Sequence, residues 1–88
     1  MQFLHARENL KAGDVVVVNC DHQCNVSVMS DSDFSSYKNR QRHQYHGGFF
    51  ERLPARVIVP SDGIWNVAVD AGGSPTTIRA GISFQRHS

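Results

Sequence analysis

Regular alternation of apolar and polar residues marks the last third of the chain. Over 64–70, Trp65, Val67 and Val69 share one side of an extended segment, because successive side chains of a strand point to opposite faces. The residues of 78–84 alternate in the same way, with apolar positions at Ile78, Ala80, Ile82 and Phe84. The pattern predicts two strands, each with one buried face, in an antiparallel meander.

Shorter apolar stretches predict further strands earlier in the chain. Residues 15–18 are consecutive valines, a β-branched run that disfavours a helix and suits a strand covered on both sides. Val26 and Val28 alternate with polar neighbours, and a polar break at 21–23 separates the two segments. We predict a hairpin from this pair of segments. We also predict an edge strand over 2–7 and strands over 49–53 and 56–59.

Residues 31–39 interrupt the strand pattern. Ser32 or Asp31 is suited to cap one or two helical turns, and Phe34 and Tyr37 lie three residues apart on one side of such a turn. We therefore predict a short helix or an ordered loop that packs on the sheet through its two aromatic rings.

Turn signals separate these segments roughly every 8 to 12 residues, the rhythm of a sandwich or barrel. We predict an all-β fold: a small antiparallel β-sandwich, jelly-roll-like, or a partly open barrel, with at most one short helix near 32–38. Residues 1–88 are expected to form a single β domain, because a chain this short supports one modest core. The predicted core contains Val16 or Val17, Val26, Val28, Trp65, Val67, Val69, Ile78, Ile82 and Phe84, with Trp65 as its largest contributor.

The overall charge of the chain gives little direction. The chain has 88 residues, a formal net charge of +1 and 40% hydrophobic residues, which fits an ordinary globular domain. A nearly neutral chain offers no global attraction for nucleic acid or an anionic membrane. The first residues hold no apolar stretch long enough for a signal peptide, and the four valines are far shorter than a membrane span. We therefore expect a cytoplasmic protein with neither a membrane nor nucleic acid as its partner.

Cys20, His22 and Cys24 form the first group with potential chemistry, because all three residue types bind zinc. Residues two apart on a strand lie roughly 6.6 Å apart along it, too far for neighbouring corners of a tetrahedral site. A fourth ligand would also have to come from elsewhere, such as His5 or His46. We predict no metal, no cofactor and no obligatory disulfide, and interpret the cysteines as core or hairpin thiols.

The most uneven charge distribution lies in residues 38–46, which we call the basic segment. It reads Lys-Asn-Arg-Gln-Arg-His-Gln-Tyr-His and contains no acid. Arginines can present planar donor forks to phosphate or carboxylate, a tyrosine can supply a stacking face, and glycines let a backbone approach a ligand. The alternative is a solvated loop, balanced by Asp31, Asp33 and Glu51. The predicted ligand-binding residues are Lys38, Arg40, Arg42, His43, Tyr45, Gly47 and Gly48.

Recognised catalytic groupings are absent from the sequence. Serines, histidines and aspartates occur, but none lies in a Gly-x-Ser-x-Gly or comparable context. No Gly-Lys-Ser/Thr follows Gly47-Gly48, so this pair does not form a phosphate loop. Asp31-Ser32-Asp33 resembles the opening of a calcium loop, but Ser36 stands where the motif needs glycine and Arg42 where it needs glutamate. We assign no catalytic residue.

Several short motifs follow one another in a distinctive order along nearly the whole chain. They are Asp21-His22-Gln23, Asn25-Val26, Met29-x-Asp31-Ser32-x-Phe34-Ser35-x-Tyr37, Tyr45-x-Gly47-Gly48, and Pro60-Ser61-x-Gly63-x-Trp65-x-Val67-x-Val69-Asp70 followed by Gly72-Gly73. In this order they resemble the small bacterial family catalogued as "domain of unknown function 1883". The resemblance implies an all-β fold and a domain that occurs alone or joined to Toll/interleukin-1-receptor-like domains. It implies no established activity.

Two features depart from the family's usual pattern. Tyr-Tyr-Gly-Gly is common in the family where this chain has Tyr45-His46-Gly47-Gly48. Cysteine is not typical at positions 20 and 24, which further weakens a metal site built on them. The motif order also resembles the small jelly-roll sandwiches appended to secreted peptidases, a likeness at the level of fold only.

Two functional hypotheses of different classes follow from these observations. The first is a non-catalytic recognition module that binds a small, anionic ligand or a protein partner. The second is a small enzyme acting on a nucleotide or sugar. Short length, the absence of an acid–base pair and the implied fusion to another domain favour the first. A homo-oligomer is compatible with either hypothesis.

Overall fold

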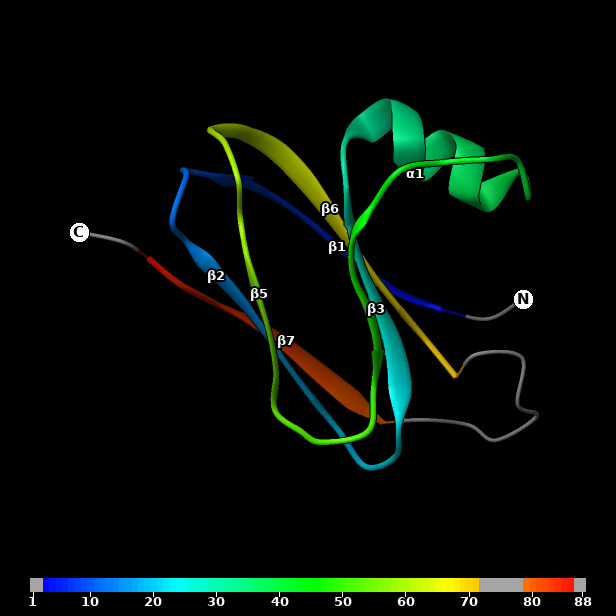
Figure 1. The fold of residues 1–88 in the computed structure, drawn as a ribbon, viewed down its shortest axis with the longest axis vertical. Coiled ribbons are helices and arrows are strands. Elements are labelled where there is room, and N and C mark those ends of the chain that lie inside the picture. The colour runs from blue at the N-terminus through cyan, green and yellow to red at the C-terminus, as the bar shows by residue number, and fades with distance from the viewer. Residues whose placement is uncertain (1–2, 72–78, 87–88) are drawn as a thin grey trace.

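The computed structural model describes residues 3–71 and 79–86, which form two antiparallel sheets and one helix (Figure 1). The four-stranded sheet has the order β1-β6-β3-β4 and the three-stranded sheet the order β5-β2-β7. Both sheets are open and do not close into a barrel. The fold is therefore a sandwich, the first of the two predicted forms. The elements are β1 (Leu4–Leu10), β2 (Val15–Cys20), β3 (Cys24–Met29), α1 (Asp31–Lys38), β4 (His46–Phe50), β5 (Ala55–Ile58), β6 (Gly63–Asp70) and β7 (Ala80–Gln85).

The predicted hairpin between the valine run and the next strand is wrong. β2 pairs with β5 and β7, whereas β3 pairs with β4 and β6. Residues 21–23 therefore cross from one sheet to the other. The predicted C-terminal meander is also wrong, because β6 lies in one sheet and β5 and β7 lie in the other. Alternation shows which side of a strand is buried, but it carries no information about the strand's partner.

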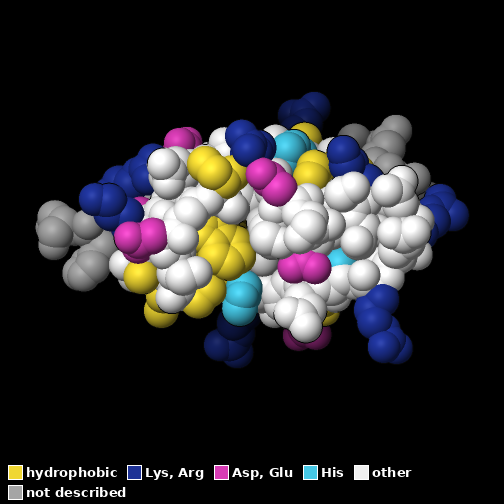
Figure 2. Space-filling view, turned by 90° about the horizontal axis from the view of Figure 1, so that it is seen from above, with side chains coloured by type: hydrophobic (Ala, Val, Ile, Leu, Met, Phe, Trp, Pro, Cys, Tyr) yellow, Lys and Arg dark blue, Asp and Glu magenta, His cyan; other side chains and the backbone are white. Residues whose placement is uncertain are grey.

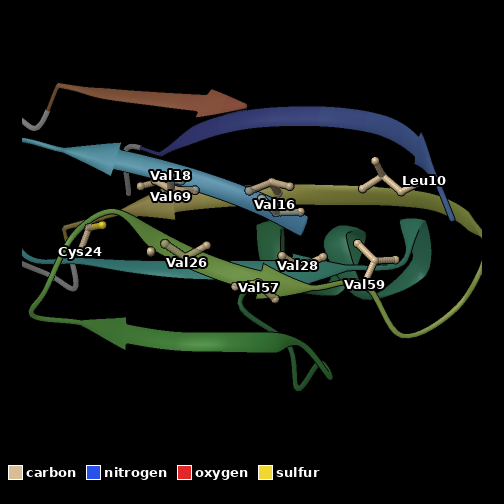
Figure 3. Close-up of a cluster of buried hydrophobic side chains, with 11 residues drawn as sticks. Leu10, Val16, Val18, Cys24, Val26, Val28, Val57, Val59 and Val69 are labelled. Atoms are coloured by element: carbon tan, nitrogen blue, oxygen red, sulfur yellow. The ribbon is translucent and has the colours of Figure 1, made fainter. Parts of the chain in front are cut away.

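The main core lies between the sheets and consists largely of valines (Figure 3). Val16, Val26, Val28, Val67 and Val69 are all fully buried there, as predicted. Val16 and not Val17 belongs to this core, because alternation along β2 turns Val17 to the other face of its sheet. Ile78 lies outside the described residues.

Three aromatic or large apolar residues assigned to the core are only partly buried. Trp65, Ile82 and Phe84 pack against the valine cluster while remaining accessible at its margin. Trp65 lies near the start of β6, where its indole N–H donates to the Ser61 carbonyl oxygen at 2.9 Å. Trp65 is therefore part of the core margin and not of its fully buried centre, because it lies beside a surface turn.

The predicted short helix is confirmed as α1, which packs on the outer face of the four-stranded sheet. Phe34 and Tyr37 are buried there with Met29 and Ala68 in a second apolar cluster. The capping residue is Ser30, and not Ser32 or Asp31, and its hydroxyl accepts from the Asp33 backbone N–H at 3.2 Å. In the described part of the chain, no helix is long and apolar enough to cross a membrane.

Candidate ligand-binding surface

The basic segment leaves the C-terminal end of α1 and leads into β4. The Arg40 N–H donates to the Tyr37 carbonyl oxygen at 3.2 Å and the Gln41 N–H to that of Ser36 at 2.8 Å. These two bonds form a Schellman motif, in which one residue adopts the left-handed conformation. Here that residue is Arg40, with φ of 57°. The chain thus places an exposed arginine at the position where helices usually have glycine.

The fixed positive charges of the segment have no ion-pair partner in the described part of the chain. Within 3–71 and 79–86, no salt bridge involves Lys38, Arg40 or Arg42. Two acids considered as balancing charges have other partners. Asp31 pairs with Arg7 at 2.8 Å. Asp33 accepts from the backbone N–H of Gln44 and from the capping hydroxyl of the helix. Arg40 and Arg42 therefore remain available to an external anion.

Aromatic rings link the basic segment to the apolar cluster beneath α1. The His43 ring lies between Tyr37, with centroids 5.3 Å apart, and Tyr45, at 5.5 Å. His43 Nδ1 also donates to the Gln41 carbonyl oxygen at 3.1 Å. The Lys38 ammonium lies 4.9 Å from the centroid of the Phe34 ring, in cation–π geometry. The structure thus brings Lys38, His43 and Tyr45 against one aromatic cluster.

Gly47 and Gly48 lie within β4, which begins at His46 and not at the predicted residue 49. Both have positive φ, 121° and 149°. A Cβ on Gly47 would collide with the Val26 carbonyl oxygen of the paired strand, whereas nothing lies near a Cβ on Gly48. The close approach that requires Gly47 is therefore made by β3, so pairing within the sheet explains this glycine without a ligand.

The sequence interpretation missed Phe49. Its side chain is 54% exposed and that of Tyr45 is 50% exposed. Phe49 is paired with Asn25, so it points to the outer face of the sheet, the face that α1 covers. Two consecutive phenylalanines follow the glycines, and strand alternation through Phe50 would have indicated that only one of them is buried.

A buried hydrogen-bonded group holds α1 to the sheet behind this surface. The Tyr37 hydroxyl donates to Asp70 Oδ2 at 2.6 Å, and the Asn25 amide donates to Oδ1 at 3.1 Å. Burial, together with the hydrogen bond and charge of Asp70, raises the pKa of Tyr37. The phenol therefore stays protonated and keeps donating. Nothing in the sequence links these three positions, because they come from three different elements.

A second polar group fixes the first turn of α1. Asn66 donates to Asp31 Oδ1 at 2.7 Å and accepts from His5 Nε2 at 2.9 Å. Arg7 contacts both oxygens of Asp31, which holds the pKa of that carboxyl well below its usual range. The His5 ring in turn stacks on Phe34, with centroids 4.0 Å apart. Together the two polar groups set the orientation of the helix from which the basic segment departs.

Charged side chains of both signs are interspersed at the end of the molecule that carries α1 (Figure 2). Seen from the end of the molecule that carries α1, Figure 2 shows basic side chains around the margin, with acidic side chains and exposed apolar patches between them. Within the described ranges, no three His, Cys, Asp or Glu side chains come together to hold a metal ion. His22 is exposed on the crossing between the sheets and does not join the two cysteines in such a group.

The architecture defines a class, that of small two-sheet β domains with one helix on the outside of the larger sheet. The chain belongs to the family described as "Domain of unknown function (DUF1883)", whose model matches residues 1–88. This confirms the resemblance drawn from the order of the motifs. A search of curated proteins and a search of solved structures each found no match.

Proposed function

We propose that this protein is a non-catalytic recognition module whose basic segment binds a carboxylate or phosphate group of a small ligand or protein partner. The observation that carries the proposal is the conformation of Arg40. A left-handed backbone costs a non-glycine residue on the order of 1 kcal/mol or more. A requirement for the guanidinium at this place explains why an exposed arginine occupies the turn.

The charge environment supports the same proposal. Arg40 and Arg42 are exposed and form no salt bridge among the described residues. A guanidinium without an internal acidic partner can donate two parallel hydrogen bonds to an incoming carboxylate or phosphate. Because the chain as a whole has a formal charge of only +1, attraction to the anion comes from this segment. Added salt should therefore weaken binding.

The exposed rings suggest how a ligand would be oriented. Tyr45 and Phe49 are both at least half exposed, and the His43 ring lies next to that of Tyr45. Such rings can stack on a planar or apolar part of a ligand while the arginines hold its charge. Lys38, held over the Phe34 ring, adds a third positive charge to the basic segment. A cytoplasmic location in a bacterial cell belongs to the same proposal, and the free thiols of Cys20 and Cys24 are compatible with that reducing compartment.

The experiment is a thermal-shift screen of the parent protein with nucleotides, sugar phosphates and an acidic peptide, followed by titration of any compound that stabilises it. The test variant carries Arg40→Glu and Arg42→Glu. The control carries Arg52→Glu and Arg56→Glu, which change the net charge equally at exposed positions outside the basic segment. We expect the test variant to fold and to bind at least about tenfold more weakly, since two charge-assisted hydrogen bonds are lost. The control should bind like the parent.

Arg40→Gly tests whether the guanidinium, and not the turn itself, is needed for binding. Glycine adopts the left-handed conformation readily. The variant should therefore be more stable than the parent by roughly 0.5–1 kcal/mol and should bind more weakly. The proposal fails if no anion in the panel stabilises the parent, or if the doubly charge-reversed variant binds as well as the parent.

A further inference from the structure

The crossing between the two sheets brings the only two cysteines of the chain together. β2 ends at Cys20 and β3 begins at Cys24. Because these strands belong to facing sheets, their ends meet across the sandwich instead of along one hairpin. The two Sγ atoms lie 2.9 Å apart, and both cysteines are free thiols.

We propose that Cys20 and Cys24 form a reversible disulfide that covalently links the two sheets. A peroxide forms this disulfide by oxidation, and a dithiol reduces it again. A disulfide bond is about 2.05 Å long, so the sulfurs need to approach by only about 0.9 Å from their present separation. The three-residue crossing is held beside them, since Asp21 exchanges hydrogen bonds of 3.1 and 2.9 Å with the Arg79 backbone. Bond formation therefore requires little rearrangement of the chain.

The two sulfurs have different surroundings, which assigns their roles. Cys20 is partly exposed, whereas Cys24 is fully buried against the valine cluster. Burial is the main cause that raises the pKa of Cys24 to about 12, so this thiol stays protonated and shielded. Cys20 is thus the sulfur that meets an oxidant in solution, and Cys24 is the one that resolves the product.

The chemistry needs one peroxide molecule. The Cys20 thiolate attacks one oxygen of hydrogen peroxide, the O–O bond breaks, and the hydroxide released takes up a proton to become water. Cys24 then attacks the sulfenic sulfur of Cys20. The S–S bond forms, the S–O bond breaks, and the departing hydroxide takes the Cys24 proton and leaves as a second water. Two electrons pass from the sulfurs to the peroxide.

The proposed disulfide is independent of the anion-binding function. Cys24 is paired with Phe50, at the far end of the β3–β4 ladder from His46, where the basic segment enters β4. Closing the bond therefore changes the connection between the sheets at the end of this ladder away from Arg40 and Arg42. Failure of one proposal does not affect the other.

The test treats the folded, reduced protein with a small excess of hydrogen peroxide and measures intact mass, free thiols and thermal unfolding. We expect the mass to fall by that of two hydrogen atoms, both thiols to disappear, and no covalent dimer to form. The unfolding midpoint should rise by roughly 5–10 °C, because a crosslink restricts the unfolded chain. Dithiothreitol should restore the original mass and midpoint.

Two single variants separate the roles of the sulfurs. Cys24→Ala leaves Cys20 without a partner, so peroxide should add one oxygen atom to Cys20, trapped as a dimedone adduct. Cys20→Ala leaves only the buried thiol, which should react at least tenfold more slowly. The proposal is overturned if the parent keeps both thiols, if the product is a covalent dimer, or if the two variants react at the same rate.

Discussion

The two faces of the four-stranded sheet are buried by different means. The inner face carries valines from β3 and β6, all without access to solvent, and it packs on the other sheet. The outer face carries Asn25, Asn66 and Asp70, which are hydrogen-bonded beneath or beside α1, together with the apolar side chains of Met29 and Ala68. Apolar surface can be buried against many shapes, because the hydrophobic effect has no direction. Hydrogen bonds impose distances and angles, so the outer face alone fixes where the helix and the basic segment lie.

This difference predicts where substitutions will affect stability and where they will affect the geometry of the candidate site. An inner-face truncation should lower the free energy of unfolding without moving the helix. An outer-face truncation should cost less stability and should disturb the basic segment. The following substitutions test that division, beginning with the largest effect.

Leu10→Ala tests the inner face. Leu10 is fully buried in the main cluster, so its truncation should lower the free energy of unfolding by about 2–5 kcal/mol through lost burial and a cavity. Leu4→Ala is the matched control, because Leu4 lies on the same face of β1 but is 39% exposed. Urea unfolding of both variants measures the difference. Equal losses would contradict the assignment of Leu10 to the core.

Gly47→Ala tests the join between the basic segment and the sheet. The new Cβ meets the Val26 carbonyl oxygen in a backbone conformation that disfavours alanine, and we expect a loss of roughly 2–3 kcal/mol. Gly48→Ala meets open space and should cost about 1 kcal/mol, from its positive φ alone. Thermal or urea unfolding gives both values. If Gly48→Ala were the more harmful substitution, the described β3–β4 pairing would be wrong.

Tyr37→Phe tests the outer face. The variant keeps the buried ring but removes the hydroxyl that donates to Asp70 at 2.6 Å, and loss of this bond should cost about 1–3 kcal/mol. Amide resonances of the basic segment should shift as well, because the bond to Asp70 orients the Tyr37 ring that contacts His43. Ser35→Ala, at an exposed position of the same helix, should change neither. A stability loss without any shift would show that the hydroxyl does not position the segment.

Asp31→Asn should have the smallest effect, and one that depends on pH. The pKa of Asp31 is depressed in the folded protein by Arg7 and Asn66. Its contribution to stability is therefore present above the unfolded pKa of about 3.9 and is lost as the pH falls towards the folded value. The parent should be more stable than Asp31→Asn at pH 7, and the difference should shrink below about pH 4. Glu51→Gln, at another exposed acid, serves as the control for a general charge effect.

Much of the local structure was readable from the sequence. The serines and aspartates before Phe34 indicated a short helix near 32–38, observed as Asp31–Lys38, and alternation identified the strand that became β6. Alternation also placed Val26, Val28, Val67 and Val69 on buried faces. These features depend on residues a few positions apart, so the periodicity of apolar residues in the sequence predicts them directly.

The candidate site was only partly readable. The run of basic residues marked Arg40 and Arg42, but nothing local showed that Arg40 would close the helix in the left-handed conformation. Gly47 looked like a place for ligand approach, whereas its neighbour in space is the backbone of Val26. Phe49 was missed because its exposure depends on the register of β4 against β3.

Elements and their buried faces were thus determined by the sequence itself, since each depends on the order of apolar and polar residues over a few positions. Which strands pair was decided only in the tertiary structure. Valine runs offer equivalent hydrogen bonds and similar apolar surfaces to any neighbour, so the choice rests on contacts between distant parts of the chain. That choice sends β2 and β3 to different sheets, and it is the reason that Cys20 and Cys24 face each other across the sandwich.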